Sequence, residues 1–275
     1  MSEFWANRRV LVTGGSSGLG RILAESFARS GARVAICALE PGAAQTAARE
    51  IATVTGAKTL GITADITRQE DVDQVIGKIR GEWGNGDSQD GLEVLVNNAG
   101  RSMRGKVAET TPEQFRDLME LNLIALVRMT RACLPMLLAS GGSVVNIGSL
   151  ASKSASRWVG AYPATKHAVA AYTQQLRLEL NPEGLHVLLV CPGPIQRDTE
   201  RLYPLEGLEG CPDRARRPGA GVRVRTIPPG YLADRLLRAC ERRVPELVIP
   251  GKARLLFAIS QLWPRLGDWV VRKST

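Results

Sequence analysis

A glycine-rich turn between an apolar run and an amphipathic segment most constrains the fold of this chain. Residues 9–13, Arg-Val-Leu-Val-Thr, form a short run suited to a buried strand, and Gly-Gly-Ser-Ser-Gly-Leu-Gly follows at 14–20. Apolar side chains at 22–27 then recur at helical spacing. The order is therefore strand, glycine turn and helix, and a second strand at 33–37 completes a βαβ unit.

The same alternation of short strands and longer helices continues along the chain. Short runs of Val, Ile and Leu between helices predict a parallel sheet that is covered on both faces. The fold class is therefore α/β, with a single Rossmann-type domain built on a doubly wound parallel sheet with helices on both faces. We assign 1–250 to this domain, including a Gly-, Pro- and Arg-rich loop at 197–230, and 251–275 to an amphipathic, basic C-terminal tail. The predicted strands are 9–13, 33–37, 59–63, 92–96, 143–147 and 185–190, and the helices after the first are 43–54, 70–83, 112–140 and 162–180.

Composition excludes several classes of protein. The N-terminal residues lack the apolar stretch of a secretory signal, and no window approaches the roughly 18 to 20 apolar residues of a spanning helix. Five scattered cysteines without a C-x-x-C pair argue against a disulfide framework and a structural zinc site. Two histidines are too few for a His-rich metal centre or a convincing Ser/His/Asp triad. We therefore expect a cytoplasmic protein with no metal site.

The net charge of +9 is concentrated near the C-terminus. Residues 1–196 hold 20 basic and 18 acidic side chains, whereas 197–275 hold 16 basic and 9 acidic ones. Such a surface is either a solvated basic face or a region that attracts an anionic partner. Aromatic residues make up only 5% of the chain and no nucleic-acid motif is present, so we expect no nucleic-acid partner.

The glycine turn lies where a dinucleotide would bind. Glycine has no Cβ, so the backbone at Gly14, Gly18 and Gly20 can approach a pyrophosphate, whose charge is favoured by the N-terminus of the following helix. An ordinary tight turn between strand and helix is the alternative.

Four separate motifs resemble the short-chain dehydrogenase/reductase family over about residues 8–200. They are Thr13-Gly14-x-x-x-Gly18-x-Gly20, Asn97-Asn98-Ala99-Gly100 after the fourth strand, Asp65 at the adenine-side position, and Pro192-Gly193 after the sixth strand. The resemblance implies an NAD(P) cofactor and a homodimer or homotetramer. The cofactor contacts that it implies are Thr13, Gly14, Ser16, Ser17, Gly18, Leu19, Gly20, Asp65, Ile66, Asn98, Ala99, Gly100, Tyr162, Lys166, Pro192, Gly193 and Ile195.

The end of the second strand bears on the choice between NAD and NADP. An acidic residue there binds the ribose hydroxyls and repels a 2′-phosphate. The family's usual acidic position aligns with Ala38 and its usual phosphate-binding arginine with Leu39, so neither marker is present. Glu40 is either a ribose ligand or a solvated carboxylate. The sequence favours NADP over NAD.

Tyr162 and Lys166 are four residues apart on a helix, so their side chains share one face. A nearby ammonium favours phenolate, so we expect Lys166 to lower the pKa of Tyr162. Ser149 follows a buried strand and precedes Tyr162 by thirteen residues, the spacing typical of the family. The resemblance adds Asn122 at the family's proton-relay position.

These residues predict an oxidoreductase that interconverts an alcohol and a carbonyl. Ser149 would bind the substrate oxygen, and Tyr162 would act as the general acid and base. The Pro-Gly-Pro-Ile sequence at 192–195 and the tail are similar to the branch of the family that handles lipophilic carbonyls. A non-catalytic cofactor-binding sensor or scaffold is the alternative function.

Two regions depart from the pattern or lie beyond it. Arg197 stands close to where the family usually carries Thr, and five arginines cluster in the expected substrate loop 197–230: Arg214, Arg216, Arg217, Arg223 and Arg225. Residues 252–273 mix apolar and basic side chains. This segment is either an amphipathic helix on an anionic membrane surface, which would make the protein peripheral, or a helix buried against the core or a subunit partner.

Overall fold

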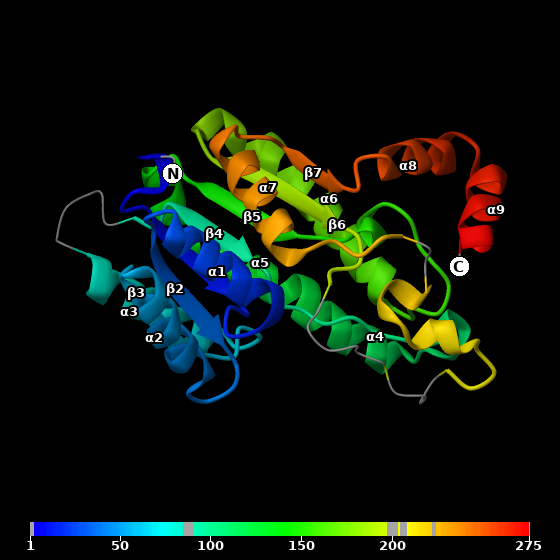
Figure 1. The fold of residues 1–275 in the computed structure, drawn as a ribbon, viewed down its shortest axis with the longest axis horizontal. Coiled ribbons are helices and arrows are strands. Elements are labelled where there is room, and N and C mark those ends of the chain that lie inside the picture. Colours follow the sequence, from blue (N-terminus) through cyan, green and yellow to red (C-terminus); the bar gives the residue numbers. More distant parts are fainter. Residues whose placement is uncertain (1–2, 85–90, 197–202, 204–207, 222–223, 275) are drawn as a thin grey trace.

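Seven parallel strands form one sheet in the order β3-β2-β1-β4-β5-β6-β7 (Figure 1). The structure is a computed structural model that describes residues 3–84, 91–196, 203, 208–221 and 224–274. The strands are β1 (Arg9–Thr13), β2 (Arg33–Ala38), β3 (Thr59–Thr63), β4 (Val94–Asn97), β5 (Ser143–Ile147), β6 (His186–Pro192) and β7 (Glu246–Ile249). The fold class predicted from the sequence is confirmed.

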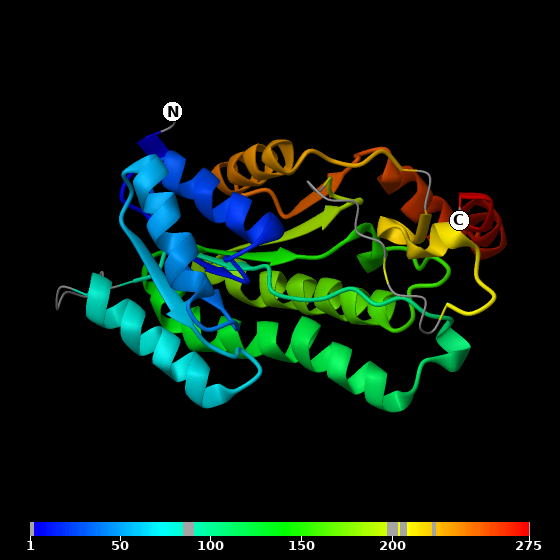
Figure 2. The same cartoon turned by 60° about the horizontal axis from the view of Figure 1, so that its bottom comes forward.

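Helices connect the strands and cover both faces of the sheet (Figure 2). The α-helices are α1 (Gly18–Arg29), α2 (Ala43–Thr55), α3 (Gln69–Trp83), α4 (Pro112–Met119), α5 (Ala125–Ala139), α6 (Tyr162–Leu180), α7 (Pro229–Glu241), α8 (Ala253–Leu262) and α9 (Pro264–Ser274). A π-helical turn, η3 (Glu120–Ile124), joins α4 to α5. Short 3-10 turns are η1 (Glu3–Trp5), η2 (Val107–Glu109), η4 (Leu150–Ser152), η5 (Asn181–Glu183), η6 (Asp213–Arg216) and η7 (Pro218–Gly221).

Alternation along each strand divides the core into two layers. In β1, Val10 and Val12 pack with α1, α2 and α7, whereas Leu11 faces α3 and α5. All three side chains are fully buried. Successive strand residues point to opposite faces, so an apolar residue at every position requires helices on both sides.

The strand order reverses direction between β1 and β4. The chain moves outward from β1 to β2 and β3, then returns to pair β4 with the other side of β1, with Val10 opposite Val94. In such sheets the loops beyond the carboxyl ends of the strands diverge at this point and leave a crevice for a ligand.

Several details differ from the expected elements, and α7 was not predicted. β7 was not predicted, because Glu-Leu-Val-Ile is only four residues long and follows a basic, proline-containing segment. β4 begins at Val94 rather than at residue 92. The helix expected over 112–140 is broken into α4, η3 and α5 by the π-helical turn, which apolar periodicity does not reveal.

The expectation that no window suits a membrane span was also wrong by composition. Among the described residues, the helical stretch Pro112–Ala139 contains an 18-residue window with a mean hydropathy of 1.5, which is long and apolar enough to cross a membrane. Its α5 part packs on β4, β5 and α3, and Met129, Cys133 and Leu137 are fully buried. This stretch therefore serves as a core helix of the domain.

Close packing of α2 on β3 depends on Gly61. A Cβ at this position would lie 2.4 Å from Cα of Gln45 and 2.5 Å from the carbonyl oxygen of Ala44. Both atoms belong to the backbone of α2, so neither can move without shifting the helix.

We predict that Gly61→Ala lowers the free energy of unfolding by about 1–3 kcal/mol or more, because it overpacks this contact. The matched control is Gly77→Ala in α3, where a Cβ would meet nothing within 4 Å. The control should stabilise the protein by up to about 1 kcal/mol, since alanine favours a helix over glycine. Urea unfolding followed by circular dichroism measures both, and equal stability of the two variants would contradict the packing argument.

Candidate active site

The turn after β1 is held against β4 by side-chain hydrogen bonds. The Asn98 amide donates from Nδ2 to the carbonyl oxygens of Thr13 at 3.0 Å and Gly14 at 3.1 Å. In return, Oγ1 of Thr13 accepts from the backbone N–H groups of Asn98 at 3.0 Å and Ala99 at 3.1 Å. Both residues therefore shape the turn through their side chains.

Two glycines of the turn are required by its geometry. Gly14 has φ of +63°, a conformation that disfavours other residues. A Cβ on Gly20 would lie 2.1 Å from the carbonyl oxygen of Gly14, so no side chain fits there. The backbone can fold back on itself only because both positions lack a Cβ.

The residues of the turn fit a dinucleotide. Gly18 is the first residue of α1, and a Cβ built on it would meet nothing within 4 Å, so open space lies beside the helix N-terminus. Backbone N–H groups in the first turn of a helix have no intrahelical partner and favour an anion. The turn therefore provides both the space and the donors that a pyrophosphate requires.

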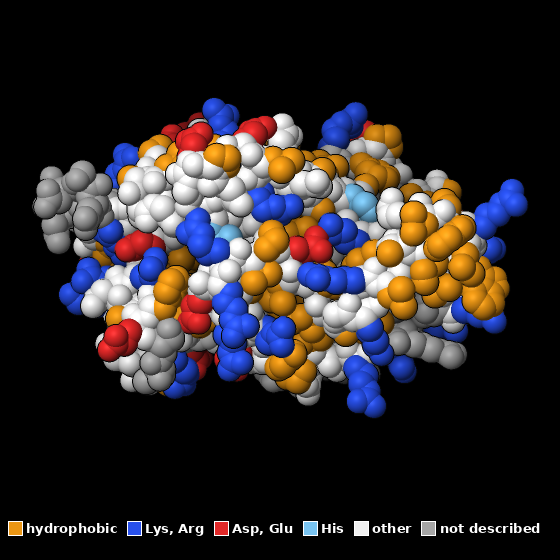
Figure 3. Space-filling view, turned by 90° about the horizontal axis from the view of Figure 1, so that it is seen from above, with side chains coloured by type: hydrophobic (Ala, Val, Ile, Leu, Met, Phe, Trp, Pro, Cys, Tyr) orange, Lys and Arg blue, Asp and Glu red, His pale blue; other side chains and the backbone are white. Residues whose placement is uncertain are grey.

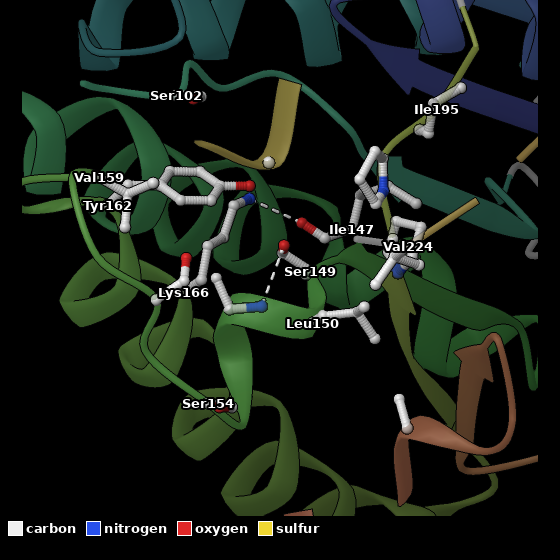
Figure 4. A pocket seen from close by; sticks show the side chains of 18 of the residues that line it. Ser102, Ile147, Ser149, Leu150, Ser154, Val159, Tyr162, Lys166, Ile195 and Val224 are labelled. Carbon is white, nitrogen blue, oxygen red and sulfur yellow. Dashed lines mark hydrogen bonds between the residues drawn. The ribbon is translucent and has the colours of Figure 1, made fainter. Parts of the chain in front are cut away.

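A cavity of about 480 Å³ lies at the carboxyl ends of the central strands (Figure 4). This volume is typical of sites for small molecules and cofactors. It is lined by residues from the β1 turn, from the loops after β4, β5 and β6, from α6, and from the two C-terminal helices. The predicted site residues that line it are Leu19, Asn98, Gly100, Ser149, Tyr162, Lys166, Pro192, Gly193 and Ile195.

Ser149, Tyr162 and Lys166 converge on this cavity. Ser149 caps the short helix η4 after β5, whereas Tyr162 and Lys166 lie in the first turns of α6. Figure 4 shows the serine hydroxyl, the phenol and the amine pointing toward one another. The backbone N–H of Ala151 donates to Oγ of Ser149 at 3.1 Å, which fixes the orientation of the hydroxyl.

Burial raises the pKa of the Tyr162 phenol, and a hydrogen bond with Ser149 opposes part of this effect. The expectation that Lys166 lowers this pKa was wrong for the geometry observed. The Lys166 amine lies 6.0 Å from the centroid of the tyrosine ring and donates instead to the carbonyl oxygen of Ile147 at 2.8 Å. Removal of water from the phenol therefore dominates.

Lys166 is itself buried, with 6% of its surface exposed. Burial lowers the pKa of its ammonium from 10.5 to about 8. Burial disfavours the charged form of the amine because it removes the ammonium from water. Among the described residues, no carboxylate lies within hydrogen-bond distance of Lys166 to offset this cost.

Asn122 lies in the π-helical turn η3 and is buried. Its Oδ1 accepts from the backbone N–H of Arg101 at 2.9 Å, and its Nδ2 donates to the carbonyl oxygen of Arg101 and to Oγ1 of Thr165, both at 3.0 Å. These bonds join η3 to α6 and to the loop after β4. Single π-helical turns are frequently found at functional sites because they redirect side chains and carbonyls.

The other predicted site residues do not line the cavity. Asp65 follows β3, and its Oδ1 accepts hydrogen bonds from the backbone N–H and the hydroxyl of Thr67. The carbonyl oxygen of Ile66 accepts from Arg128 at 3.3 Å. The predicted residues outside the lining are Thr13, Gly14, Ser16, Ser17, Gly18, Gly20, Asp65, Ile66, Ala99 and Asn122.

Several lining residues were not predicted. Arg101, Ser102 and Arg104 come directly after the Asn-Asn-Ala-Gly motif, a position that marks the loop beyond β4 but does not show where its side chains point. The Arg104 guanidinium stacks over the ring of Tyr203 at 3.9 Å. Apolar side chains of the C-terminal helices complete the wall: Ala253, Leu256, Phe257 and Val271.

Of the arginine cluster in the expected substrate loop, the four described members, Arg214, Arg216, Arg217 and Arg225, do not line the cavity. The Arg216 side chain donates to the carbonyl oxygen of Tyr203 at 3.0 Å, and the carbonyl oxygen of Arg217 accepts from Arg104 at 3.2 Å. Both arginines therefore support cavity residues from outside. Arg197, Arg223 and the segments 197–202, 204–207 and 222–223 lie outside the described residues.

Comparison with known proteins places the chain in a family. A family model described as short chain dehydrogenase matches residues 8–204. Dehydrogenase/reductase SDR family member 7B of Danio rerio is 31% identical over 266 residues, which cover 94% of this chain and 82% of that protein. Sorbitol dehydrogenase of Cereibacter sphaeroides is 33% identical over 190 residues, 68% of this chain and 70% of that protein.

Solved structures show the same fold. A short-chain dehydrogenase from Streptomyces avermitilis superposes with a TM-score of 0.76 at 29% identity, covering 98% of this chain and 100% of the other. The L-sorbose reductase of Gluconobacter frateurii, solved with NADPH and L-sorbose, has a TM-score of 0.76 at 23% identity and covers 90% of this chain and 97% of its own. With its glycine turn and its Ser149, Tyr162 and Lys166 around one cavity, this chain belongs to the short-chain dehydrogenase family and is an NAD(P)-dependent oxidoreductase acting between alcohols and carbonyls.

Proposed function

We propose that Tyr162 is the general acid and base of this oxidoreductase, that Ser149 binds the substrate oxygen, and that the substrate is lipophilic. The observation that carries the proposal is the convergence of both hydroxyl groups on one cavity of about 480 Å³. A substrate oxygen placed between them would be within reach of both donors, as proton transfer requires.

The hydrogen bonds around Ser149 define its role. Because the N–H of Ala151 already donates to Oγ, the hydroxyl proton of Ser149 is available to donate to the substrate oxygen. A nicotinamide cofactor, when bound, supplies the hydride in reduction and accepts it in oxidation. The raised pKa of Tyr162 keeps the phenol protonated near neutral pH, so it can donate its proton to the same oxygen during reduction.

Lys166 links α6 to the end of β5 within the site. Its ammonium bonds to the carbonyl oxygen of Ile147, the last residue of β5, and this contact ties the first turns of α6 to the sheet. An ammonium has three donors, so this bond engages only one of them. We assign the remaining donors to the ribose of the cofactor.

The walls of the cavity support a lipophilic substrate. Apolar side chains from three separate segments face it: Leu150 after β5, Val159 before α6, and Phe257 from α8. A carbonyl group would reach Ser149 and Tyr162 while the remainder of the substrate contacts this apolar wall.

We also propose that NADP is preferred over NAD. β2 ends at Ala38, which places no carboxylate at the position that would repel a 2′-phosphate. Leu39 and Glu40, which follow, are both exposed.

Tyr162→Phe should lower turnover by about 10² to 10⁴ because the variant has no proton to transfer. Cofactor affinity, measured by quenching of protein fluorescence, should be unchanged. The assay follows absorbance of NADPH and NADH with a panel of lipophilic ketones and aldehydes. Tyr172→Phe, on the same helix, is the matched control and should retain turnover. A Tyr162→Phe enzyme that is as active as this control would refute the assignment and favour a non-catalytic role for the site.

Lys166→Met should make the protein without cofactor more stable at pH 7, since burial of the ammonium costs on the order of 3 kcal/mol for a pKa moved from 10.5 to about 8. The folded pKa lies below the unfolded one, so the unfolded chain binds more protons between these values and wild-type stability rises as pH increases from about 8 to 10.5. The advantage of the variant should therefore shrink across this window.

Thermal unfolding at several pH values measures this difference. Lys78→Met, at an exposed position of α3, controls for the loss of a lysine. An advantage for Lys166→Met that stays constant from pH 7 to 10.5 would show that the buried charge is not its source.

Ala38→Asp should lower the ratio of kcat/KM for NADPH to that for NADH by about tenfold or more, because the new carboxylate repels the 2′-phosphate and accepts from the ribose hydroxyls. Glu40→Gln is the matched control and should leave the ratio unchanged. A wild-type enzyme that prefers NADH, and loses this preference on Glu40→Gln, would assign the ribose contact to Glu40 instead.

A further inference from the structure

The two C-terminal helices expose an apolar surface that the oxidoreductase activity does not require. Figure 3 shows hydrophobic side chains gathered at the end of the molecule that α8 and α9 form. Five of the twelve large hydrophobic side chains that are exposed in the described residues belong to this hairpin, with exposed fractions from 46% to 68%. We call them the hairpin patch: Leu255, Leu262, Trp263, Leu266 and Trp269.

The hairpin patch does not line the cavity, whereas Leu256, Phe257 and Val271 of the same two helices do. The two helices contact each other, most closely at Gly267, where a Cβ would lie 2.6 Å from Cα of Ser260. α8 contacts β7 and has no fully buried residue. The patch residues therefore remain open to solvent in the described part of the chain.

A cationic groove lies beside the hairpin. Arg235 and Arg238 of α7, Arg242 directly after α7, and Arg254 of α8 line a groove of about 420 Å³. The one carboxylate in its lining, Glu246, pairs with Lys153 at 2.7 Å and so offers little charge compensation to the arginines. We call these four residues the arginine groove.

We propose that the hairpin patch and the arginine groove together dock this protein on an anionic phospholipid bilayer. Tryptophan side chains favour the boundary between headgroups and acyl chains, and both Trp263 and Trp269 lie in the patch. Guanidinium groups pair with phosphate oxygens of lipid headgroups. Arg254 of the groove and Leu255 of the patch are consecutive residues of α8, so the cationic and apolar residues meet on that helix.

Charge favours a bilayer over a second copy of the chain as the occupant. A twofold contact through this whole face would bring the arginine grooves of two copies together. Like charges placed opposite each other disfavour such a contact. An anionic lipid surface instead complements the groove and accepts the patch at the same time.

The test is cosedimentation of the full chain with phosphatidylcholine vesicles, with and without about 30 mol% phosphatidylglycerol. Binding should require the anionic lipid and weaken as salt is raised, and the tryptophan emission should shift to shorter wavelength on binding. Trp263→Ser with Trp269→Ser should reduce the partition coefficient by about tenfold or more, since both rings lose their contact with the bilayer. Val54→Ser with Leu178→Ser, at two exposed positions of the same chain outside the hairpin, should bind like wild type.

The arginine groove is tested separately by Arg235→Gln, Arg238→Gln and Arg242→Gln combined. This variant should lose about tenfold or more of its binding to anionic vesicles. The proposal is overturned if the full chain does not bind anionic vesicles at low salt, or if either set of variants binds like wild type. It is also overturned if the tryptophan variants dissociate an oligomer in light scattering, because a second copy would then cover the patch.

The outcome is independent of the proposed catalytic role. None of the substituted side chains lines the cavity, so turnover of a water-soluble carbonyl without vesicles should be unchanged in all these variants. A chain that binds vesicles but reduces no carbonyl would refute the proposed function and leave the proposed docking surface intact. A chain that reduces carbonyls but binds no vesicles would refute the docking surface and leave the proposed function intact.

Discussion

The hydrogen bonds between Asn98 and the glycine turn are the contact on which the rest of the site depends. They join the end of β1 to the end of β4 at the point where the strand order reverses. Gly14 and Gly15 also donate to the carbonyl oxygen of Cys37, which ties the turn to β2. Without Asn98, the carbonyl oxygens of Thr13 and Gly14 would lose the side-chain donor that ties the turn to β4. Doubly wound sheets generally leave a crevice where the strand order reverses. The bonds from Asn98 fix the shape of the glycine turn at this crevice and so define where a cofactor would bind.

The site also retains an unfavourable charge. Lys166 would be more stable in water, and burial lowers its pKa to about 8, yet the fold holds it next to Ile147 and near Tyr162. A buried charge can be retained when the packing of the surrounding core stabilises the folded state by more than the charge destabilises it. In α6, the buried face that includes Val169 and Leu176 contributes this stabilisation.

Most of the fold could be predicted from the sequence because strands and helices differ in the period of their apolar residues. Six of the seven strands were found in this way, and β7 was missed because four residues carry too little pattern. The π-helical turn at Asn122 could not be found either, since a single added residue changes the register without changing composition.

The site was predicted in part, for a similar reason. Ser149, Tyr162 and Lys166 stand at characteristic spacings in the sequence and meet at the cavity. The direction in which the pKa of Tyr162 moves depends on its burial, which the spacings do not reveal. The periodicity of 252–273 indicated amphipathic helix and left its partner open. Only the three-dimensional structure shows that Leu256 and Phe257 face the cavity.

Helix α8 has one side that lines the cavity and another that is exposed to solvent. Phe257 bounds the volume in which a substrate would lie, whereas Leu255 on the same helix is turned to the exterior. A contact on the exterior of α8 that moved the helix would also reshape the wall of the cavity. By thermodynamic reciprocity, a ligand whose affinity changed with that movement would alter the exterior contact by the same factor.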